Sequence, residues 1–323
     1  MDKHLYIIGN GFDIHHGINS SYLNFRDWMQ MQNSDVIEDF ENAYGECDEE
    51  WWADFENKLA SLDIIEYASQ IAFANQPDLA SDHCDRMWND AQIEVEQQLD
   101  GLYSELRRCF HDWIMQLNKP LAEKKIKLQT DNSLFFNFNY TTTLETLYCV
   151  KSENVLHIHG CVGIDEDFII GHGKTLYDLR KENPDVNSIP PEDLTEEEYI
   201  EWLDAQSDSK EFHEQLAEDA AFGGVASQRK PVEQIINRNE EFFRKLKGFN
   251  RVHVYGISFS QVDMPYLKRI AQETTETEWE FSDYNNQHRD DIIKFTLNNA
   301  IKKYKIMELE SLMLKRQLDI LFQ

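Results

Sequence analysis

The feature that constrains this chain most is a short strand that runs directly into two glycines. Residues 5–8 form an apolar run rich in β-branched and aromatic side chains, a pattern typical of a buried strand. Gly9 and Gly11 follow at once, separated by Asn10. A Gly-x-Gly turn at the carboxyl end of a strand lets backbone approach a ligand closely, as in nucleotide-binding α/β domains. The sequence therefore predicts an α/β domain whose ligand site begins at this loop.

The same glycines also fit an ordinary turn from a strand into a helix. A third glycine at the spacing of the dinucleotide fingerprint is missing from the sequence. Asp13 lies two residues beyond the turn, where a carboxylate can contact a ribose hydroxyl or a catalytic water, or cap the following helix. The loop alone leaves both interpretations open.

The charge of the chain restricts its partners. The 323 residues include 60 acidic and 31 basic side chains, which gives a formal net charge of -29. Such a surface repels phosphate backbones and anionic lipid, so we expect neither nucleic acid nor a membrane as a partner. Small molecules and other proteins remain as partner classes.

The cysteines indicate a reducing compartment. Five cysteines are spread along the chain and none forms a Cys-x-x-Cys pair, which argues against a disulfide framework and against a zinc module. The chain also has no apolar stretch of transmembrane length, and its first residues lead into a strand rather than a signal-peptide core. We expect a cytoplasmic protein.

Strand patterns alternate with helical patterns along the rest of the chain. The expected strands are residues 134–140, 155–159, 168–170, 252–256 and 279–282, with helices from there to the end. This alternation predicts a doubly wound, mostly parallel Rossmann-like sheet within a single domain, 1–323. Amphipathic stripes over 34–120 predict a helical insertion, and the acidic stretch 176–228 predicts a second insertion or a lid.

Ligands of open parallel sheets bind beyond the carboxyl ends of the strands, where this chain places a series of polar residues. Histidine titrates near neutral pH, so His159 is the leading acid/base candidate, with His157 as its competitor on the same side of the strand. The His-x-His pair also raises a metal site, but no acidic residue lies at a familiar ligand spacing, and we expect no metal. The strand-end residues are Gly9, Asn10, Gly11, Asp13, Asn139, Tyr140, His157, His159, His172, Ser258, Ser260, Ser282 and Asp283.

Two nucleophile motifs are disfavoured. The segment from Gly256 to Ser260 resembles the nucleophile elbow of serine hydrolases, but Ser260 replaces the second glycine. Cys161 follows a His-Gly pair without a convincing base, and we interpret it as a packing residue.

Four motifs together resemble the AbiH family of bacteriophage abortive-infection proteins. They are IGNGFD at residues 8–13, NFNYT at 137–141, HIHG at 157–160 and GISFSQVD at 256–263. The chain is also remotely similar to the SIR2-like NAD-binding fold of antiphage NAD hydrolases. This second resemblance implies a SIR2-like sheet and NAD or a related nucleotide as ligand, without a metal.

The SIR2-like resemblance also assigns residues. It aligns the catalytic His-Gly with His159-Gly160 and the ribose-contacting Gly-x-Ser loop with Gly256-Ile257-Ser258. A Thr-Asn-Tyr-Asp element with a later glutamate corresponds to Asn139-Tyr140-Thr141 and Glu145. Two departures stand out: Asp13 occupies the position of a serine, and Thr141 that of an aspartate.

The hypothesis that follows is hydrolysis of NAD or a related nucleotide at its N-glycosidic bond. The amides of Gly9, Asn10 and Gly11 would hold the pyrophosphate, while Tyr140, Gly256, Ser258 and Asp263 complete the nucleotide site. Asn139 would orient the ribose or water, His159 would accept a proton, and Asp13 would stabilise the cationic sugar.

A non-catalytic nucleotide sensor that signals to a partner protein is the alternative. The sequence leaves open whether the chain forms a homo-oligomer or binds a defence-system partner.

Overall fold

The computed structural model describes residues 2–76, 87–165, 167–184, 195 and 212–313. It divides into two compact units. Residues 1–28, 109–170 and 231–323 form the first, which we call the sheet unit, and residues 29–108 and 171–230 form the second, the helical unit. All the residues predicted to bind or act on a nucleotide belong to the sheet unit.

The described part of the sheet unit contains one six-stranded, entirely parallel sheet, which confirms the predicted α/β fold class. Its strand order is β3-β2-β1-β4-β5-β6, so the order reverses between β1 and β4. Ligands of open α/β sheets bind at such a reversal. The strands are β1 (His4–Ile8), β2 (Ser133–Asn137), β3 (Val155–His157), β4 (Arg251–Tyr255), β5 (Glu278–Ser282) and β6 (Tyr304–Met307).

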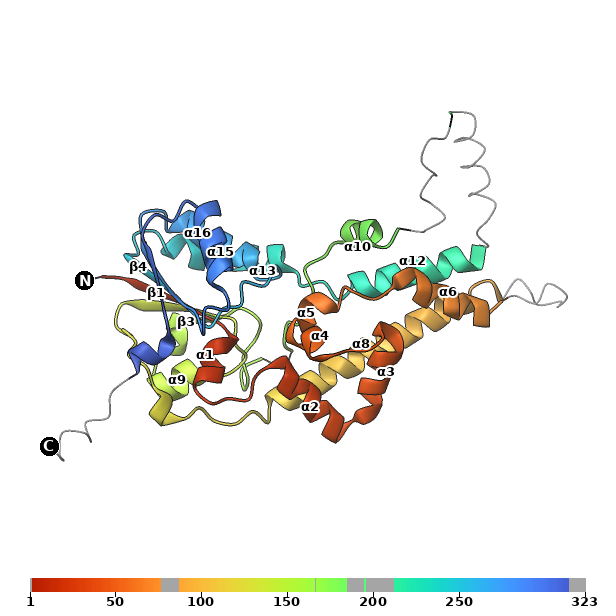
Figure 1. The fold of residues 1–323 in the computed structure, drawn as a ribbon, viewed down its shortest axis with the longest axis horizontal. Coiled ribbons are helices and arrows are strands. Elements are labelled where there is room, and N and C mark those ends of the chain that lie inside the picture. Colours follow the sequence, from red (N-terminus) through yellow and green to blue (C-terminus); the bar gives the residue numbers. More distant parts are fainter. Residues whose placement is uncertain (1, 77–86, 166, 185–194, 196–211, 314–323) are drawn as a thin grey trace. The chain divides into compact units, whose positions relative to one another are not determined.

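Helices cover both faces of this sheet (Figure 1). Alternate strand residues point to opposite faces, so Leu5 and Ile7 belong to one buried cluster while Tyr6 and Ile8 belong to another. The first cluster packs against α13 (Val232–Arg238), α14 (Glu240–Lys245), α15 (Met264–Glu273) and α16 (Arg289–Asn298). The second packs against α1 (Asn10–His15), α9 (Thr143–Tyr148) and the 3-10 turn η4 (Leu309–Leu312). Two further turns are η1 (Ala122–Lys124) and η2 (Ser152–Asn154).

Two strand predictions were wrong. Residues 168–170 form no strand; they pass beside the segment after β3, where the Ile169 N–H donates to the His159 carbonyl at 2.8 Å. Residues 304–307, expected within a helix, form the edge strand β6, whose four residues, YKIM, are too few to show a clear strand pattern and include Lys305. Lysines are common on edge strands because they discourage pairing with another chain. The continuation of the expected last helix, from Leu314 onward, lies outside the described residues.

The helical unit is built from amphipathic helices around a buried aromatic and aliphatic core that includes Phe40, Trp52 and Phe55. Helix α6 packs along α12. Its helices are α3 (Ser34–Tyr44), α4 (Glu49–Ala53), α5 (Phe55–Lys58), α6 (Ile64–Ala74), α10 (Leu176–Glu182) and α12 (Phe212–Ala226). Two more, α2 (Tyr22–Gln32) and α8 (Asp90–Ile114), contain residues of both units. Much of the predicted acidic segment 176–228 lies outside the described residues.

Among the described residues, none of the helices combines the length and apolarity that crossing a bilayer requires.

Candidate functional site

The loops after β1 and β4 touch through their glycines. The Gly9 N–H donates to the Tyr255 carbonyl and the Gly11 N–H to the Gly256 carbonyl, both at 2.9 Å. A Cβ on Gly11 would lie 2.8 Å from the Gly256 Cα, and a Cβ on Gly256, whose φ is +71°, would lie 2.1 Å from the Phe12 nitrogen. The glycines therefore permit backbone to meet backbone at the reversal of strand order. Two of the three amides predicted to hold a pyrophosphate already have acceptors in the protein.

Asn10, the residue between these glycines, is bonded through its side chain. Its amide nitrogen donates to the Ser20 carbonyl at 2.9 Å, and the Ser20 hydroxyl donates back to the Asn10 amide oxygen. This reciprocal pair ties α1 to the segment that follows it. Asn10 is half-buried and thus borders solvent at the carboxyl edge of the sheet.

Asn139 links the segment after β2 to the loop after β1. Its side-chain amide donates to the Gly9 carbonyl at 3.0 Å, and its backbone N–H donates to the Asn137 side-chain oxygen at 3.1 Å. The residue is only 6% exposed. In this arrangement the Asn139 amide fixes the glycine loop.

Asp13 is fully surrounded by protein and accepts two hydroxyl hydrogen bonds. Thr141 donates to one carboxylate oxygen at 2.6 Å and Thr143 to the other at 2.8 Å. Burial raises the pKa of Asp13 to about 6, against the opposing effect of these hydrogen bonds. The carboxyl group therefore titrates close to neutral pH.

His159 is buried among aromatic side chains near the carboxyl edge of the sheet. The rings of Phe138, Tyr140 and Tyr266 have centroids 5.5, 6.3 and 5.8 Å from its imidazole. Its Nε2 lies 4.0 Å from the Oδ1 of Asp263, the N-cap residue of α15. An imidazole beside a carboxylate can take up a proton, because the carboxylate stabilises the cation that forms.

His157 has a different environment from His159, so the structure distinguishes two histidines that the sequence alone could not. Its Nε2 lies 2.9 Å from Glu145 Oε1. Burial alone would lower the pKa of His157, but hydrogen bonds with Cys161 and Glu145 and their charges raise it to about 10. His157 thus contacts a glutamate of α9, whereas His159 faces Asp263.

The remaining predicted residues occupy varied positions. Tyr140 is half-buried and donates its hydroxyl to the Ile169 carbonyl at 3.0 Å, while Ser258 is exposed in the loop after β4. The Gly256 N–H donates to the Ser282 hydroxyl. His172 is not part of this edge: it belongs to the helical unit, where its Nε2 bonds to the Val225 carbonyl.

Two residues of this site were not predicted from the sequence. Thr143 supplies a hydroxyl to Asp13, and Tyr266 packs its ring beside His159. The run of three threonines at 141–143 was a signal for the first, since hydroxyls at the start of a helix often bond to nearby polar groups. Tyr266 gave no comparable signal, because an aromatic on an amphipathic helix reads as core.

The comparison with protein families decides where this chain belongs. The model described as "Bacteriophage abortive infection AbiH" matches residues 5–283. The chain belongs to the AbiH family. This confirms the resemblance seen in the motifs and gives the protein a role in phage abortive infection. No curated protein and no solved structure matched.

The match spans five of the six strands and every predicted site residue, from Gly9 to Asp263. The described elements beyond the matched range are α16, β6 and η4. The carboxyl edge of the sheet thus lies within the matched range.

Metal ligands do not gather in the described part of the chain, where no three His, Cys, Asp or Glu side chains converge on one point.

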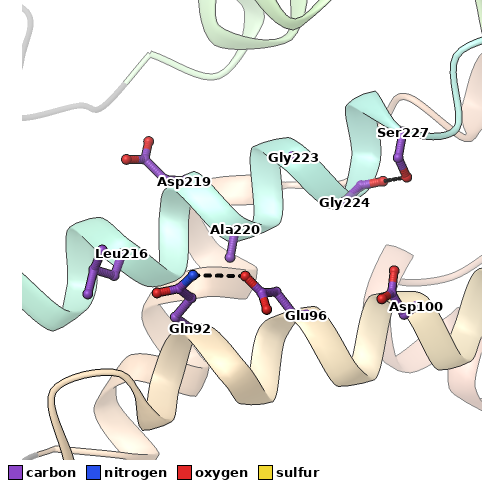
Figure 2. A pocket seen from close by; sticks show the side chains of 9 residues that line it. All are labelled: Gln92, Glu96, Asp100, Leu216, Asp219, Ala220, Gly223, Gly224 and Ser227. Atoms are coloured by element: carbon purple, nitrogen blue, oxygen red, sulfur yellow. Dashed lines mark hydrogen bonds between the residues drawn. The ribbon is translucent and has the colours of Figure 1, made fainter.

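A cavity of about 360 Å³ lies elsewhere, in the helical unit (Figure 2). Figure 2 shows it between α8 and α12, with Glu96 and Asp100 on one helix and Asp219 on the other. Carboxylates repel the phosphates of a nucleotide. This groove contains none of the predicted site residues, and we place the candidate site at the carboxyl edge of the sheet.

Proposed function

We propose that this AbiH-family protein binds a nucleotide at the carboxyl edge of its sheet and hydrolyses NAD, or a related nucleotide, at the N-glycosidic bond. The observation that supports this most is the His159–Asp263 pair, at the edge where loops from β1, β2, β3 and β4 converge.

The proposed reaction needs a base but no metal. The bond between nicotinamide and ribose breaks with its electron pair on the leaving nicotinamide, and positive charge develops on the sugar. Water adds to the sugar carbon, and His159 takes up the proton that the water releases. Asp263 stabilises the resulting imidazolium.

Asp13 and Asn139 act from within the protein in this proposal. The buried Asp13 carboxylate does not reach the surface where the substrate would bind. Its negative charge would stabilise a cationic sugar at the edge electrostatically, without direct contact. Asn139 holds the glycine loop in place. The half-buried Asn10 and Tyr140 and the exposed Ser258 are the groups that border solvent and would contact the nucleotide.

The Asp13–Thr141 contact supports the likeness to SIR2-like domains. The resemblance places a serine at position 13 and an aspartate at position 141, and this chain has the carboxylate and the hydroxyl the other way round. The two side chains are joined by a hydrogen bond of 2.6 Å. The same carboxylate–hydroxyl pair would then be preserved with its two ends exchanged.

A nucleotide sensor is the second candidate, favoured by one specific observation. Asp13, Asn139 and His159 are exposed by only 1%, 6% and 3%, so all three groups predicted to act on the substrate are buried. A site of this kind can bind a nucleotide at its rim and pass the signal to a partner without turnover.

The test is incubation of the purified protein with NAD and a nucleotide panel, with and without extract of phage-infected cells. Nicotinamide and ADP-ribose are measured by chromatography. We expect release that disappears in His159→Ala and Asn139→Ala and persists in His288→Ala, a partly exposed histidine on another loop. Binding without release would favour the sensor, and absence of both would overturn the proposal.

A further inference from the structure

We propose that His157 and Glu145 form an ion pair that positions the Asn139 loop, and that His157 itself takes no part in bond breaking. The inference rests on the proposed function only for its effect on turnover. The ion pair itself, and its hold on Asn139, are properties of the protein without any ligand.

Both nitrogens of the His157 ring have partners. Nε2 lies 2.9 Å from Glu145 Oε1, and the two side chains are 9% and 14% exposed. Nδ1 lies 3.3 Å from the Asn139 carbonyl and equally 3.3 Å from the Asn137 side-chain nitrogen. A ring enclosed on both sides in this way offers no free nitrogen to a substrate, in contrast to a general base.

The two neighbours of Nδ1 differ in kind, one being an acceptor and the other a donor. A protonated ring donates to the Asn139 carbonyl, while a neutral ring with its hydrogen on Nε2 accepts from Asn137. The Asn137 amide is already oriented, because its oxygen accepts the Asn139 N–H at 3.1 Å. The charge on His157 therefore decides whether the ring holds Asn139 or Asn137.

Asn139 passes this hold to the glycine loop. Its side-chain amide donates to the Gly9 carbonyl, so a continuous series of contacts runs from Glu145 on α9 through His157 at the end of β3 to the loop after β1. The last of these contacts, from Asn139 to Gly9, joins segments 130 residues apart in sequence. Loss of the ion pair should loosen Asn139 and, through it, the loop that borders the nucleotide.

Three titratable groups face His157 from the elements packed around it. Glu145 lies on α9, Cys161 in the segment after β3 and Asp13 on α1. Glu145 and Cys161 favour the charged ring. In return, the His157 charge opposes the effect of burial on Asp13 and keeps more of that carboxyl ionised.

The experiment is a titration of the full chain by NMR, with ¹⁵N-labelled histidine rings observed from pH 5 to pH 11. We expect His157 to show two protonated nitrogens at pH 7, and the backbone amide of Asn139 to shift with the same midpoint as the His157 ring. Glu145→Gln should lower that midpoint by about 1 pH unit or more. Glu153→Gln, at an exposed glutamate on η2, should leave it unchanged.

A neutral His157 ring at pH 7 in the unaltered protein would overturn the ion pair, and an Asn139 amide that ignores the titration would overturn the positioning role. Neither readout needs a ligand or a variant that folds, so they stand even if no nucleotide is cleaved. If NAD is cleaved, Glu145→Gln should reduce kcat several-fold and shift its pH profile, with a smaller change in KM. Unchanged kcat would also contradict the positioning role.

Discussion

Two histidine–glutamate pairs of the sheet unit have the same length and different neighbours. His157 and Glu145 meet at 2.9 Å at the carboxyl edge, and His253 and Glu280 meet at 2.9 Å in the middle of the sheet. In the first pair the histidine is the centre, since it contacts a helix, a strand end and a loop. In the second the glutamate is the centre.

The Glu280 carboxylate on β5 receives hydrogen bonds from both neighbouring strands. His253 and Tyr255 on β4 and Lys305 on β6 all donate to it. His253 on β4 and Lys305 on β6 are the residues that pair with Glu280 in the two neighbouring strands, so the three polar side chains form a row across the sheet. A buried pair between strands in register thus fixes the sheet, whereas a pair between a helix and a strand end fixes a loop.

The largest effect is expected from Glu280→Ala. The change leaves His253 and Tyr255 buried without their acceptor, and breaking a buried ion pair by removing one partner costs about 3–5 kcal/mol of unfolding free energy. Urea unfolding measures it.

Glu278→Ala is the matched control on the same strand. That side chain is 53% exposed and pairs with Arg251 at 3.5 Å, so its loss should cost about 0–1 kcal/mol.

Burial disfavours the Glu280 charge, but bonds from His253, Lys305 and Tyr255 lower its pKa to about 2. The stability this adds is present above pH 4.5 and is lost as the pH falls toward 2. Equal losses in the two variants would refute the central place of Glu280.

Asp13 should give the opposite pH dependence. Its pKa is raised by burial from 3.8 to about 6, so the folded state binds the proton more tightly than the unfolded state. Stability should therefore fall as the pH rises from about 4 to about 6, by up to about 3 kcal/mol. Unfolding of Asp13→Asn across this range should lack that slope; a slope that survives would assign it to another group.

Glu145→Gln should have a moderate effect on stability. The glutamine keeps an acceptor for His157 but loses the charge, and a hydrogen bond to a charged group contributes about 1.5–3 kcal/mol. Because the folded pKa of His157 is raised from 6.5 to about 10, its contribution is complete below pH 6.5 and is lost as the pH rises toward 10. Unfolding at pH 6 and pH 9.5 should show the variant's deficit shrinking at the higher pH.

Apart from the control Glu278→Ala, His4→Phe should have the smallest effect. His4 Nδ1 lies 2.9 Å from His253 Nε2 and the two rings stack at 5.3 Å, so phenylalanine keeps the stacking and loses one hydrogen bond. The expected cost is about 0.5–1.5 kcal/mol, measured by urea unfolding. A cost as large as that of Glu280→Ala would show that the network depends on the histidine pair instead of the carboxylate.

The sequence predicted the fold class and the edge that bears the polar residues, because apolar strands ending in glycine have a clear pattern. It could not separate His157 from His159, since their difference comes from partners on other elements, Glu145 and Asp263. The sequence also did not predict that Gly9 and Gly11 contact Gly256. Glycine is required both where two backbones meet and where a backbone meets a ligand, so the residue type does not distinguish the two cases.

The polar row around Glu280 was missed for a different reason. Tyr6, His253 and Glu280 lie on one face of the sheet, and the apolar residues on either side of each of them face the opposite buried cluster. This alternation is a clear strand pattern. The charges read as solvent-facing, and only the pairing across strands shows that they are buried.

The most direct test of the central claim is hydrogen–deuterium exchange of the full chain with saturating ADP-ribose. We expect protection in peptides that cover residues 8–13, 137–141 and 256–263, and unchanged exchange in α8 and α12 of the helical unit. Protection confined to α8 and α12, or no protection anywhere, would contradict a nucleotide site at the carboxyl edge of the sheet.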